Sequence, residues 1–426
     1  MAYEQLDTLK QTNPQEEHQE KGFNFLHVGI RNRLLVLKSI ALNGPISRAE
    51  LANQLGLTRT TLGNIVSELT ENDLIQENDG IDSQESSAVG RRPILLSLSD
   101  NSPCILGILI KRYYLTGVVA DLSGKIITQS TRTYEGAIDA EQLVSMVSGI
   151  LDTLLAQTSR RVCAIGVSSI GPIDEKKRLI LSPPNFHGIN NLPICDILEK
   201  KNGIPCYLIN DANAGALAEK LYGRESETRN FIYVHIMNGI GSGYVLDHRL
   251  YSGDMGQSGE IGHSTIDFSG PVCDCGNIGC LELYANDANM NKKIRYMQKT
   301  FGIRSELFAE DRQYTLNEIL HGVDSGDHCA ISALDEFCNY LSAAMTNAIK
   351  FLNVNRVIVG YSSDSKCEAL ESVLDRNIRN RVVFSPEHDL SISHSSFGGD
   401  APLYGAIALI AELIFDGRIN WLASPD

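Results

Sequence analysis

Three cysteines and one histidine that lie close together place the strongest constraint on how this chain can fold. They are His263, Cys273, Cys275 and Cys280, within the segment 259–282, which reads GEIGHSTIDFSGPVCDCGNIGCLE. Three thiolates and one imidazole are the ligand set of a closed tetrahedral zinc site. The alternative is three buried thiols and an unrelated histidine. Because four protein ligands leave no open coordination position, the pattern predicts a structural Zn²⁺ rather than a catalytic one.

The remaining composition is that of a folded cytoplasmic protein. Hydrophobic residues make up 43% of 426 residues, which suits two or three domains. The other seven of the ten cysteines are scattered, as expected for buried thiols rather than disulfides. The N-terminus lacks the regions of a signal peptide, and the longest apolar stretch, 405–415, is shorter than the roughly 20 residues that span a bilayer. We therefore expect cytoplasmic localisation without membrane insertion.

From residue 101 to the end, apolar strands alternate with helical segments. The first set comprises strands at 105–110, 115–120, 125–128 and 164–168 around a helix near 140–157. A second set starts at 231–237 and 243–246, with long helices after about 328. Strands that alternate with helices indicate an α/β domain. Two such sets, separated by a loop-rich middle, predict a body of two lobes around a cleft over residues 101–426.

The residues before this body divide into a polar leader, 1–23, and a segment with helical periodicity, 24–100. In that segment, Ser47 with Glu50 three residues later has the spacing of a capping box. Thr58 is placed to cap the next helix. Two short helices separated by a turn, followed by a strand, a polar tip and a second strand, predict a winged helix-turn-helix domain of helices and a β-hairpin.

The second short helix has the side chains that a DNA-recognition helix needs. An apolar stripe lies on one face, and short polar residues project from the other, where they can bond to base edges in the major groove. Two arginines at the rim of the hairpin can reach phosphates or the minor groove. The predicted DNA-contacting residues are Ser47, Thr58, Arg59, Thr60, Thr61, Asn64, Arg91 and Arg92. The alternative is a three-helix bundle with a merely polar surface.

Charge sets the expected strength of this DNA contact. The whole chain carries −15, and residues 31–98 hold seven Lys/Arg against eight Asp/Glu. The positive charges are Arg31, Arg33, Lys38, Arg48, Arg59, Arg91 and Arg92. Since phosphate neutralisation supplies most non-specific affinity, each module should bind DNA modestly. We expect binding as a homodimer to two half-sites, and a homotetramer fits equally well.

Several segments resemble one known family. The run GEIGH…CxCGxxGCLE resembles the signature of the family of repressors, open reading frames and sugar kinases (ROK). GPIDEKKRLILSPPNFHG, LINDANAGALAEKLYG and FGGDAPLYGAIALI resemble its sugar-pocket loop, its catalytic-aspartate segment and its C-terminal helix entry. The resemblance implies the actin-like, sugar-kinase-like ATPase fold for residues 101–426. An N-terminal winged helix is the layout of the family's repressors, and its kinases lack it.

The resemblance also implies which residues hold a ligand. The sugar or sugar-derivative pocket would be lined by Asn185, Asn210, Asp211, Glu260, His263 and Glu282. Carboxylates and amides suit sugar hydroxyls, which present paired donors and acceptors. His263 would serve both the zinc ion and the pocket. The residue matching Asp211 is the base of family kinases; the plainer alternative is a turn aspartate that caps the following helix.

The loops that hold phosphates in family kinases are altered here. Family kinases open with an Asp-x-Gly-Gly-Thr-type turn, whereas this chain has Leu109 in place of the aspartate and Lys111 and Arg112 in place of glycines. Met237 replaces the first glycine of a second loop, and a third continues from Gly360 as Tyr-Ser-Ser. Phosphoryl transfer needs close backbone approach to the phosphates. The sequence therefore predicts no catalytic residues and no enzyme.

The predicted function is a DNA-binding regulator of carbohydrate metabolism, a repressor more than an activator, whose non-catalytic kinase-like domain binds a sugar or sugar phosphate. The alternative is an active ATP-dependent sugar kinase that carries a DNA-binding arm. A third possibility is control by a protein partner, with the sugar pocket left empty. Which sugar binds, and whether it induces or co-represses, stays open at this point.

Overall fold

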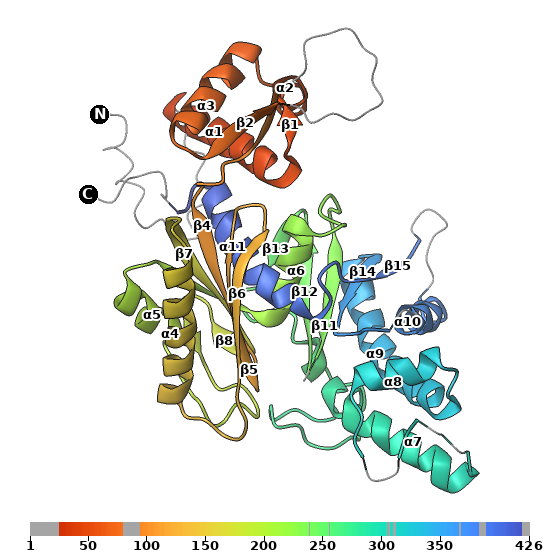
Figure 1. The fold of residues 1–426 in the computed structure, drawn as a ribbon. Coiled ribbons are helices and arrows are strands. Elements are labelled where there is room, and N and C mark those ends of the chain that lie inside the picture. Colours follow the sequence, from red (N-terminus) through yellow and green to blue (C-terminus); the bar gives the residue numbers. More distant parts are fainter. Residues whose placement is uncertain are drawn as a thin grey trace.

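Three parts make up the fold: an N-terminal module, and two lobes that form the body (Figure 1). The computed structural model describes residues 25–79, 94–237, 239–254, 256–303, 305, 307–309, 312–365, 368–382 and 389–419. The predicted leader, 1–23, lies outside these residues. The two-lobed α/β body and the N-terminal winged helix are present as predicted.

The N-terminal module is a three-helix bundle with a small antiparallel sheet. Its elements are α1 (Phe25–Asn43), β1 (Ile46–Ser47), α2 (Arg48–Leu55), α3 (Arg59–Glu71), β2 (Ile75–Asp79) and β3 (Ile94–Leu98). The strands lie in the order β1-β3-β2. The apolar stripe of α3 is buried against the other elements, as the sequence predicts, at Leu62, Ile65, Val66 and Leu69.

Local hydrogen bonds fix where the two short helices begin. Ser47 Oγ accepts the N–H of Glu50 at 3.2 Å, and the Glu50 carboxylate accepts the N–H of Ser47 at 3.0 Å, which completes the predicted capping box. Thr58 Oγ1 accepts the N–H of Thr61 at 3.2 Å. Gly56 ends α2 with φ 63°, a left-handed conformation that glycine adopts without strain. The helix-turn-helix geometry therefore follows from the local sequence.

Lobe I is built on a five-stranded sheet in the order β10-β7-β4-β5-β6. These strands are β4 (Cys104–Ile110), β5 (Tyr114–Ala120), β6 (Ile126–Thr133), β7 (Val162–Ser169) and β10 (Cys206–Asn210). The flanking elements are α4 (Ala140–Gln157), α5 (Ile194–Asn202) and a hairpin of β8 (Ile173–Asp174) and β9 (Leu179–Ile180). Every residue of β4 is buried, because helices cover both faces of this strand.

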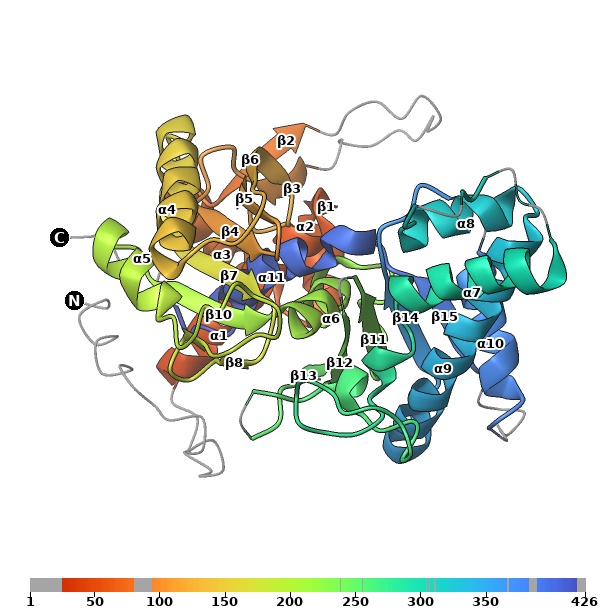
Figure 2. The same ribbon diagram turned by 90° about the horizontal axis from the view of Figure 1, so that it is seen from below.

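Lobe II repeats the plan with a second five-stranded sheet, in the order β13-β12-β11-β14-β15. Its strands are β11 (Phe231–Ile236), β12 (Ile240–Leu246), β13 (Arg249–Tyr251), β14 (Arg356–Gly360) and β15 (Ser391–His394). The helices are α7 (Asp287–Phe301), α8 (Leu316–Asp324), α9 (His328–Leu352) and α10 (Ala369–Arg379), with short turns η3 (Ile261–His263) and η4 (Leu281–Leu283). Figure 2 shows these helices gathered at the far end of the lobe.

Two helices pack against each other between the sheets: α6 (Asp211–Tyr222) and α11 (Ala401–Phe415), the latter entered through η5 (Gly398–Asp400) (Figure 1). A Cβ atom on Gly405 would lie 1.9 Å from the carbonyl oxygen of Ala214, so only glycine permits this crossing. Among the described residues, 398–415 is the one stretch long and apolar enough for a membrane span. Two thirds of it is buried within the protein, so packing explains its apolar composition.

The winged helix is not a separate body on a tether, because its hydrophobic core is continuous with that of lobe I. Helix α1 lies against the C-terminal end of α11. There, Leu34 faces Gly417, and the Lys38 ammonium lies 5.9 Å from the ring centre of Phe415. The predicted boundary near residue 100 falls between β3 and β4, and it remains a prediction.

Candidate effector pocket, metal site and DNA-reading surface

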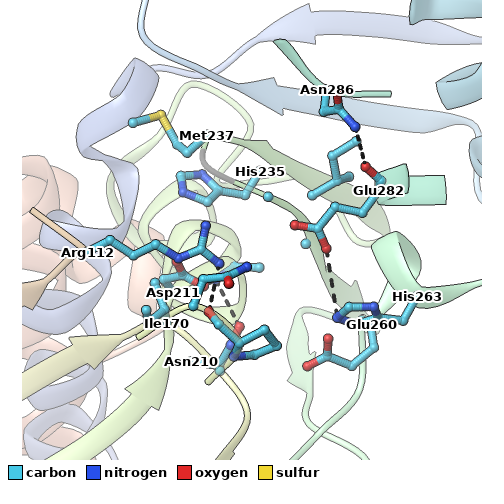
Figure 3. Close-up of a pocket in the computed structure, with 18 of the residues that line it drawn as sticks. Arg112, Ile170, Asn210, Asp211, His235, Met237, Glu260, His263, Glu282 and Asn286 are labelled. Carbon is cyan, nitrogen blue, oxygen red and sulfur yellow. Dashed lines mark hydrogen bonds and ion pairs between the residues drawn. The ribbon is translucent and has the colours of Figure 1, made fainter. Parts of the chain in front are cut away.

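A cavity of about 330 Å³ lies between the lobes (Figure 3). Its size lies at the lower end of ordinary small-molecule sites. All six residues predicted to bind the sugar line it: Asn185, Asn210, Asp211, Glu260, His263 and Glu282. The first three come from lobe I and the start of α6, and the last three come from lobe II. The structure thus brings together residues that are up to 97 positions apart in the sequence.

The pocket aspartate is fixed by the helix that it begins. Asn210 caps α6, and its Oδ1 accepts the N–H groups of Ala212 at 2.9 Å and of Asn213 at 3.3 Å. Asp211 Oδ1 accepts the same Ala212 N–H at 2.9 Å. Its other oxygen, Oδ2, accepts a hydrogen bond from Lys111 Nζ at 3.0 Å. Asp211 therefore forms an ion pair in addition to the local cap that was the plainer alternative.

Lys111 and Arg112, the two residues in the altered phosphate turn, both line the pocket. Lys111 Nζ also lies 2.9 Å from Nε2 of His235 in β11. Figure 3 shows the Arg112 side chain entering the pocket beside Asp211, and its Nη2 donates to the carbonyl of Pro184 at 3.2 Å. Two long cationic side chains therefore occupy the end of the cavity where the sequence predicts that phosphates are excluded.

Leu109, the third altered residue of this turn, points elsewhere. It is buried in the core that lobe I shares with α11 and the winged helix. Two of the three glycines that the second loop retains have close neighbours of their own. A Cβ on Gly239 would lie 2.5 Å from Glu282 Oε1, and one on Gly241 would lie 2.8 Å from the Cβ of Ala212. Close packing thus accounts for these glycines without a nucleotide.

The lobe II side of the pocket is acidic. Burial raises the pKa of Glu260 and of Glu282, and the nearby His263 acts in the opposite direction on both. Glu282 Oε2 lies 3.8 Å from His263 Nε2, the edge of the imidazole that faces the cavity. These groups offer hydrogen-bond acceptors at fixed positions, which is the chemistry that sugar hydroxyls require.

The four predicted metal ligands meet at one point. The ligand atoms of His263, Cys273, Cys275 and Cys280 all lie within 4.8 Å of one another. Cys275 Sγ is 3.7 Å from Cys280 Sγ, and Cys273 Sγ is 3.8 Å from His263 Nδ1. Tetrahedral Zn–S bonds of about 2.3 Å require S···S separations of about 3.8 Å. The donor set and its spacing therefore fit a tetrahedral metal ion, with His263 Nδ1 toward the metal and Nε2 toward the pocket.

Five of the eight predicted DNA-contacting residues are exposed around the start of the recognition helix α3. Thr58, Arg59, Thr60, Thr61 and Asn64 are exposed at the N-terminal half of α3, and Ser47 is half-buried at the start of α2. Arg91 and Arg92 lie outside the described residues. Short polar side chains at the start of a recognition helix are placed to reach base edges.

Two arginines counted among the module's positive charges are paired within it. Arg33 Nε lies 2.6 Å from Glu68 Oε2, and Arg48 forms an ion pair with Glu77. This pairing leaves Arg59 as an exposed cation on the recognition helix itself. The sequence count could not reveal these pairs, because they join residues 35 and 29 positions apart.

Two family models match this chain. The ROK family model matches residues 105–412, more than two thirds of the chain. The chain belongs to the ROK family. A second family model, described as winged helix-turn-helix DNA-binding, matches residues 31–76. The N-terminal module and the kinase-like body thus match two different families, as the sequence predicts.

Relatives and solved structures agree with this assignment. The xylose repressor of Bacillus subtilis is 30% identical over 90% of this chain and 96% of its own length. The DNA-binding transcriptional dual regulator NagC of Escherichia coli is 26% identical over 91% and 93%. A crystal structure of a ROK family transcriptional regulator, a homologue of the Escherichia coli MLC protein, has a TM-score of 0.75 at 29% identity and covers 92% of this chain and 98% of its own.

The fold is also that of the family's kinases. A ROK family glucokinase from Streptomyces griseus, solved with glucose and AMPPNP, has a TM-score of 0.63 at 22% identity and covers 72% of this chain and 98% of its own. This chain is therefore a DNA-binding repressor of the ROK family.

His235 is a pocket residue that the sequence analysis missed. Its signal is a single histidine in the otherwise apolar strand FIYVHI. Burial, then Lys111, lower its pKa to about 3, so the ring is neutral at physiological pH. Asn286 also lines the pocket; its Nδ2 donates to the carbonyl of Glu282 at 2.8 Å. No local pattern marks Asn286, because a turn asparagine after η4 has no distinguishing spacing.

Proposed function

We propose that this chain is a cytoplasmic repressor whose affinity for operator DNA is controlled by an uncharged monosaccharide bound between the two lobes. The observation that carries the proposal is the cavity itself, because it joins six acidic, amide and imidazole groups from both lobes. A ligand that bonds to both sides stabilises one arrangement of the lobes over others. Lobe I shares its core with the winged helix, so a change in the lobes alters the DNA-reading surface.

The charges that line the cavity favour an uncharged ligand over a sugar phosphate. Lys111 and Asp211 neutralise each other. Arg112 is then opposed by three carboxylates among the described lining residues, Glu260, Asp274 and Glu282. A phosphate of nearly two negative charges would meet net repulsion there. Xylose and N-acetylglucosamine, which the names of two relatives mention, are the first candidates.

Phosphoryl transfer is disfavoured by the same residues. Asp211 would act as a base only if its carboxylate were available to a sugar hydroxyl, and one of its oxygens is bonded to Lys111. The Arg112 side chain occupies the neighbouring space. We infer that the body binds its sugar without phosphorylating it.

A structural Zn²⁺ at His263, Cys273, Cys275 and Cys280 is part of this proposal. The sulfur and nitrogen spacings support it, since they suit Zn–S bonds of about 2.3 Å. The metal would orient His263 and hold the loop that carries Glu282 against the pocket. Such an ion adds its binding free energy to folding.

We further propose that two copies bind DNA together. The recognition helix begins with Thr58, Arg59, Thr60 and Thr61, followed by Asn64, and its single arginine stands against two glutamates. One such module should discriminate sequence weakly, whereas two modules on half-sites about 34–36 Å apart add their contacts.

A single experiment tests the central claim. An operator would be selected from a random duplex pool with the purified chain, and its binding followed by fluorescence anisotropy. D-xylose, D-glucose, N-acetyl-D-glucosamine and glucose 6-phosphate would be titrated, each with and without ATP and Mg²⁺. We expect one uncharged sugar to shift operator affinity at least tenfold, with no ADP formed. A response to glucose 6-phosphate alone would refute the uncharged ligand, and ADP formation would refute the non-enzymatic body.

A further inference from the structure

Lys111 is a buried ammonium group at the junction of the two lobes. Only 3% of its side chain is exposed, and lysine is almost never buried to this degree unless it is paired. Its backbone continues the β4–β5 hairpin, because its N–H donates to the carbonyl of Tyr114 at 3.0 Å. Tyr134 Oη donates to the Lys111 carbonyl at 2.8 Å. The main chain of Lys111 is therefore anchored in lobe I, while its side chain reaches away from it.

The ammonium group contacts two other elements. Nζ donates to Asp211 Oδ2, at the start of α6, at 3.0 Å, and lies 2.9 Å from His235 Nε2 in β11 of lobe II. An ammonium group has no acceptor, so Nε2 of His235 must be the acceptor and must carry no proton. One side chain thus bonds lobe I to lobe II across the pocket.

The second ring nitrogen of His235, Nδ1, also has a partner, which fixes the orientation of the ring. Since Nε2 accepts, Nδ1 of the neutral ring carries the proton, and it faces Tyr233 Oη at 3.2 Å. The rings of Tyr233 and His235 stack with centroids 6.1 Å apart. Tyr233 is fully buried in β11, against Gly215 of α6 and Gly360 of β14. A rigid part of lobe II therefore presents a fixed acceptor to Lys111.

The position of Lys111 in the fold suggests the function of its bond to His235. Lys111 occupies the turn where the family's kinases have glycines that admit nucleotide phosphates and a metal ion. In phosphoryl transfer those groups bring metal charge to the aspartate side of the cleft. In this chain the positive charge belongs to the Lys111 side chain, which is a permanent part of the protein. It forms an ion pair with Asp211, and it also acts on Asp400 at the start of α11, where burial raises the carboxyl pKa and the Lys111 charge acts in the opposite direction.

We propose that Lys111 is a positioning residue that replaces the nucleotide: it ties lobe I to lobe II through His235 and holds Asp211 in place to bind the effector sugar. The sugar pocket is then complete without ATP. The part of this inference that concerns the sugar rests on the proposed function. The tie between the lobes does not, because it is present whichever ligand binds.

The test compares two pairs of variants in the full-length chain. Lys111→Met keeps the length of the side chain and removes its donors, and Lys125→Met, at an exposed site of lobe I, is the matched control. His235→Gln keeps an acceptor near the position of Nε2, whereas His235→Leu removes it. If Lys111→Met does not fold, the two His235 variants still decide between a bond and mere packing.

The first measurement needs no ligand. Hydrogen–deuterium exchange would be followed by mass spectrometry in peptides that cover 104–120 of lobe I and 231–236 of lobe II. We expect exchange at least tenfold faster in both segments for Lys111→Met and for His235→Leu. His235→Gln and Lys125→Met should stay within twofold of the unmodified chain. Equal exchange in His235→Leu and His235→Gln would overturn the tie between the lobes.

The second measurement uses D-xylose, D-glucose and N-acetyl-D-glucosamine in thermal-shift titrations, with and without AMPPNP and Mg²⁺. We expect the half-saturating sugar concentration to rise at least tenfold in Lys111→Met, to stay within threefold in His235→Gln, and to be unchanged by AMPPNP. A sugar affinity that AMPPNP strengthens in the unmodified chain would refute the replacement of the nucleotide. If none of the sugars binds, the proposed function fails in its ligand, while the exchange measurement still decides the tie.

Discussion

Glu175 offers a quantitative test of how the two lobes touch. Its carboxyl group faces Gly256 of lobe II, where a Cβ atom would lie 3.1 Å from the carboxyl carbon. One of its oxygens, Oε1, has no hydrogen-bond partner among the described residues. Burial raises the pKa of Glu175 to about 7, more than the backbone N–H of Asn210 lowers it. The change to make is Glu175→Gln, which keeps the shape and removes the titration.

The pH dependence follows from the direction of this shift. In the unfolded chain the carboxyl group ionises near 4.5, and in the folded chain it ionises near 7. The folded state therefore holds the extra proton between these values, and stability falls as pH rises through this window. At 1.36 kcal/mol per pKa unit, the loss from pH 5.5 to 7 is about 2 kcal/mol, and it is complete above pH 7. Relative to the unmodified chain, Glu175→Gln should gain this amount between pH 5.5 and 8.

Urea unfolding of both proteins at several pH values between 5.5 and 8 measures the difference. Other titrating groups are common to both chains and cancel. Asp174→Asn is the matched control, because the pKa of Asp174 is lowered, chiefly by the backbone N–H of Lys177, and its titration lies below this window. A difference between Glu175→Gln and the unmodified chain that stays constant from pH 5.5 to 8 would show that the carboxyl group is not buried against lobe II.

Two further predictions concern the other sites. Asn64→Ala should weaken binding to the selected operator by about 1–3 kcal/mol, with little change on unrelated DNA, because a base contact carries sequence discrimination. Anisotropy titrations on both duplexes measure these affinities, with Glu71→Ala at the far end of α3 as the control. Equal losses of affinity on both duplexes would refute base readout. Cys275→Ala should abolish stoichiometric zinc and lower the melting temperature, since the metal contributes to folding. Metal analysis together with calorimetry checks this, and Cys338→Ala, which removes a buried thiol of α9 that is not part of the cluster, should keep its zinc. Unchanged zinc in Cys275→Ala would disprove the four-ligand site.

Local patterns in the sequence predict local structure well here. The capping box at Ser47 and the turn at Gly56 depend on contacts within four residues, and the apolar stripe of α3 repeats every three or four residues, so spacing is sufficient evidence for all three. The metal cluster is also local, because its ligands lie within 18 positions. The six pocket residues were reached through the family resemblance, and periodicity alone would not have found them.

Contacts between distant segments were not accessible in this way. The sequence shows Lys111 only as a replacement for a loop glycine, whereas its bond to His235 joins residues 124 positions apart. That bond exists because β4 and β11 end at the same cleft, which depends on how two sheets pack around α6 and α11. The same holds for Arg33 and Glu68, whose pairing reduces the charge available to DNA. Strand order and sheet packing, not residue identity, decide such pairs.

The contact between α1 and α11 has a consequence for folding during synthesis. The DNA-reading module is near the N-terminal end of this sequence, yet the surface that holds it ends at Phe415, about 390 positions after Phe25. At roughly 5–20 residues per second, a ribosome needs about 20 to 80 seconds to travel between them. During that interval the module can fold, because its own sheet and helices are complete by Leu98, but it has nothing to dock against. A nascent or prematurely terminated chain would therefore carry a DNA-reading module with no fixed orientation. Recognition of an operator by two copies would begin only when translation has passed the last helix.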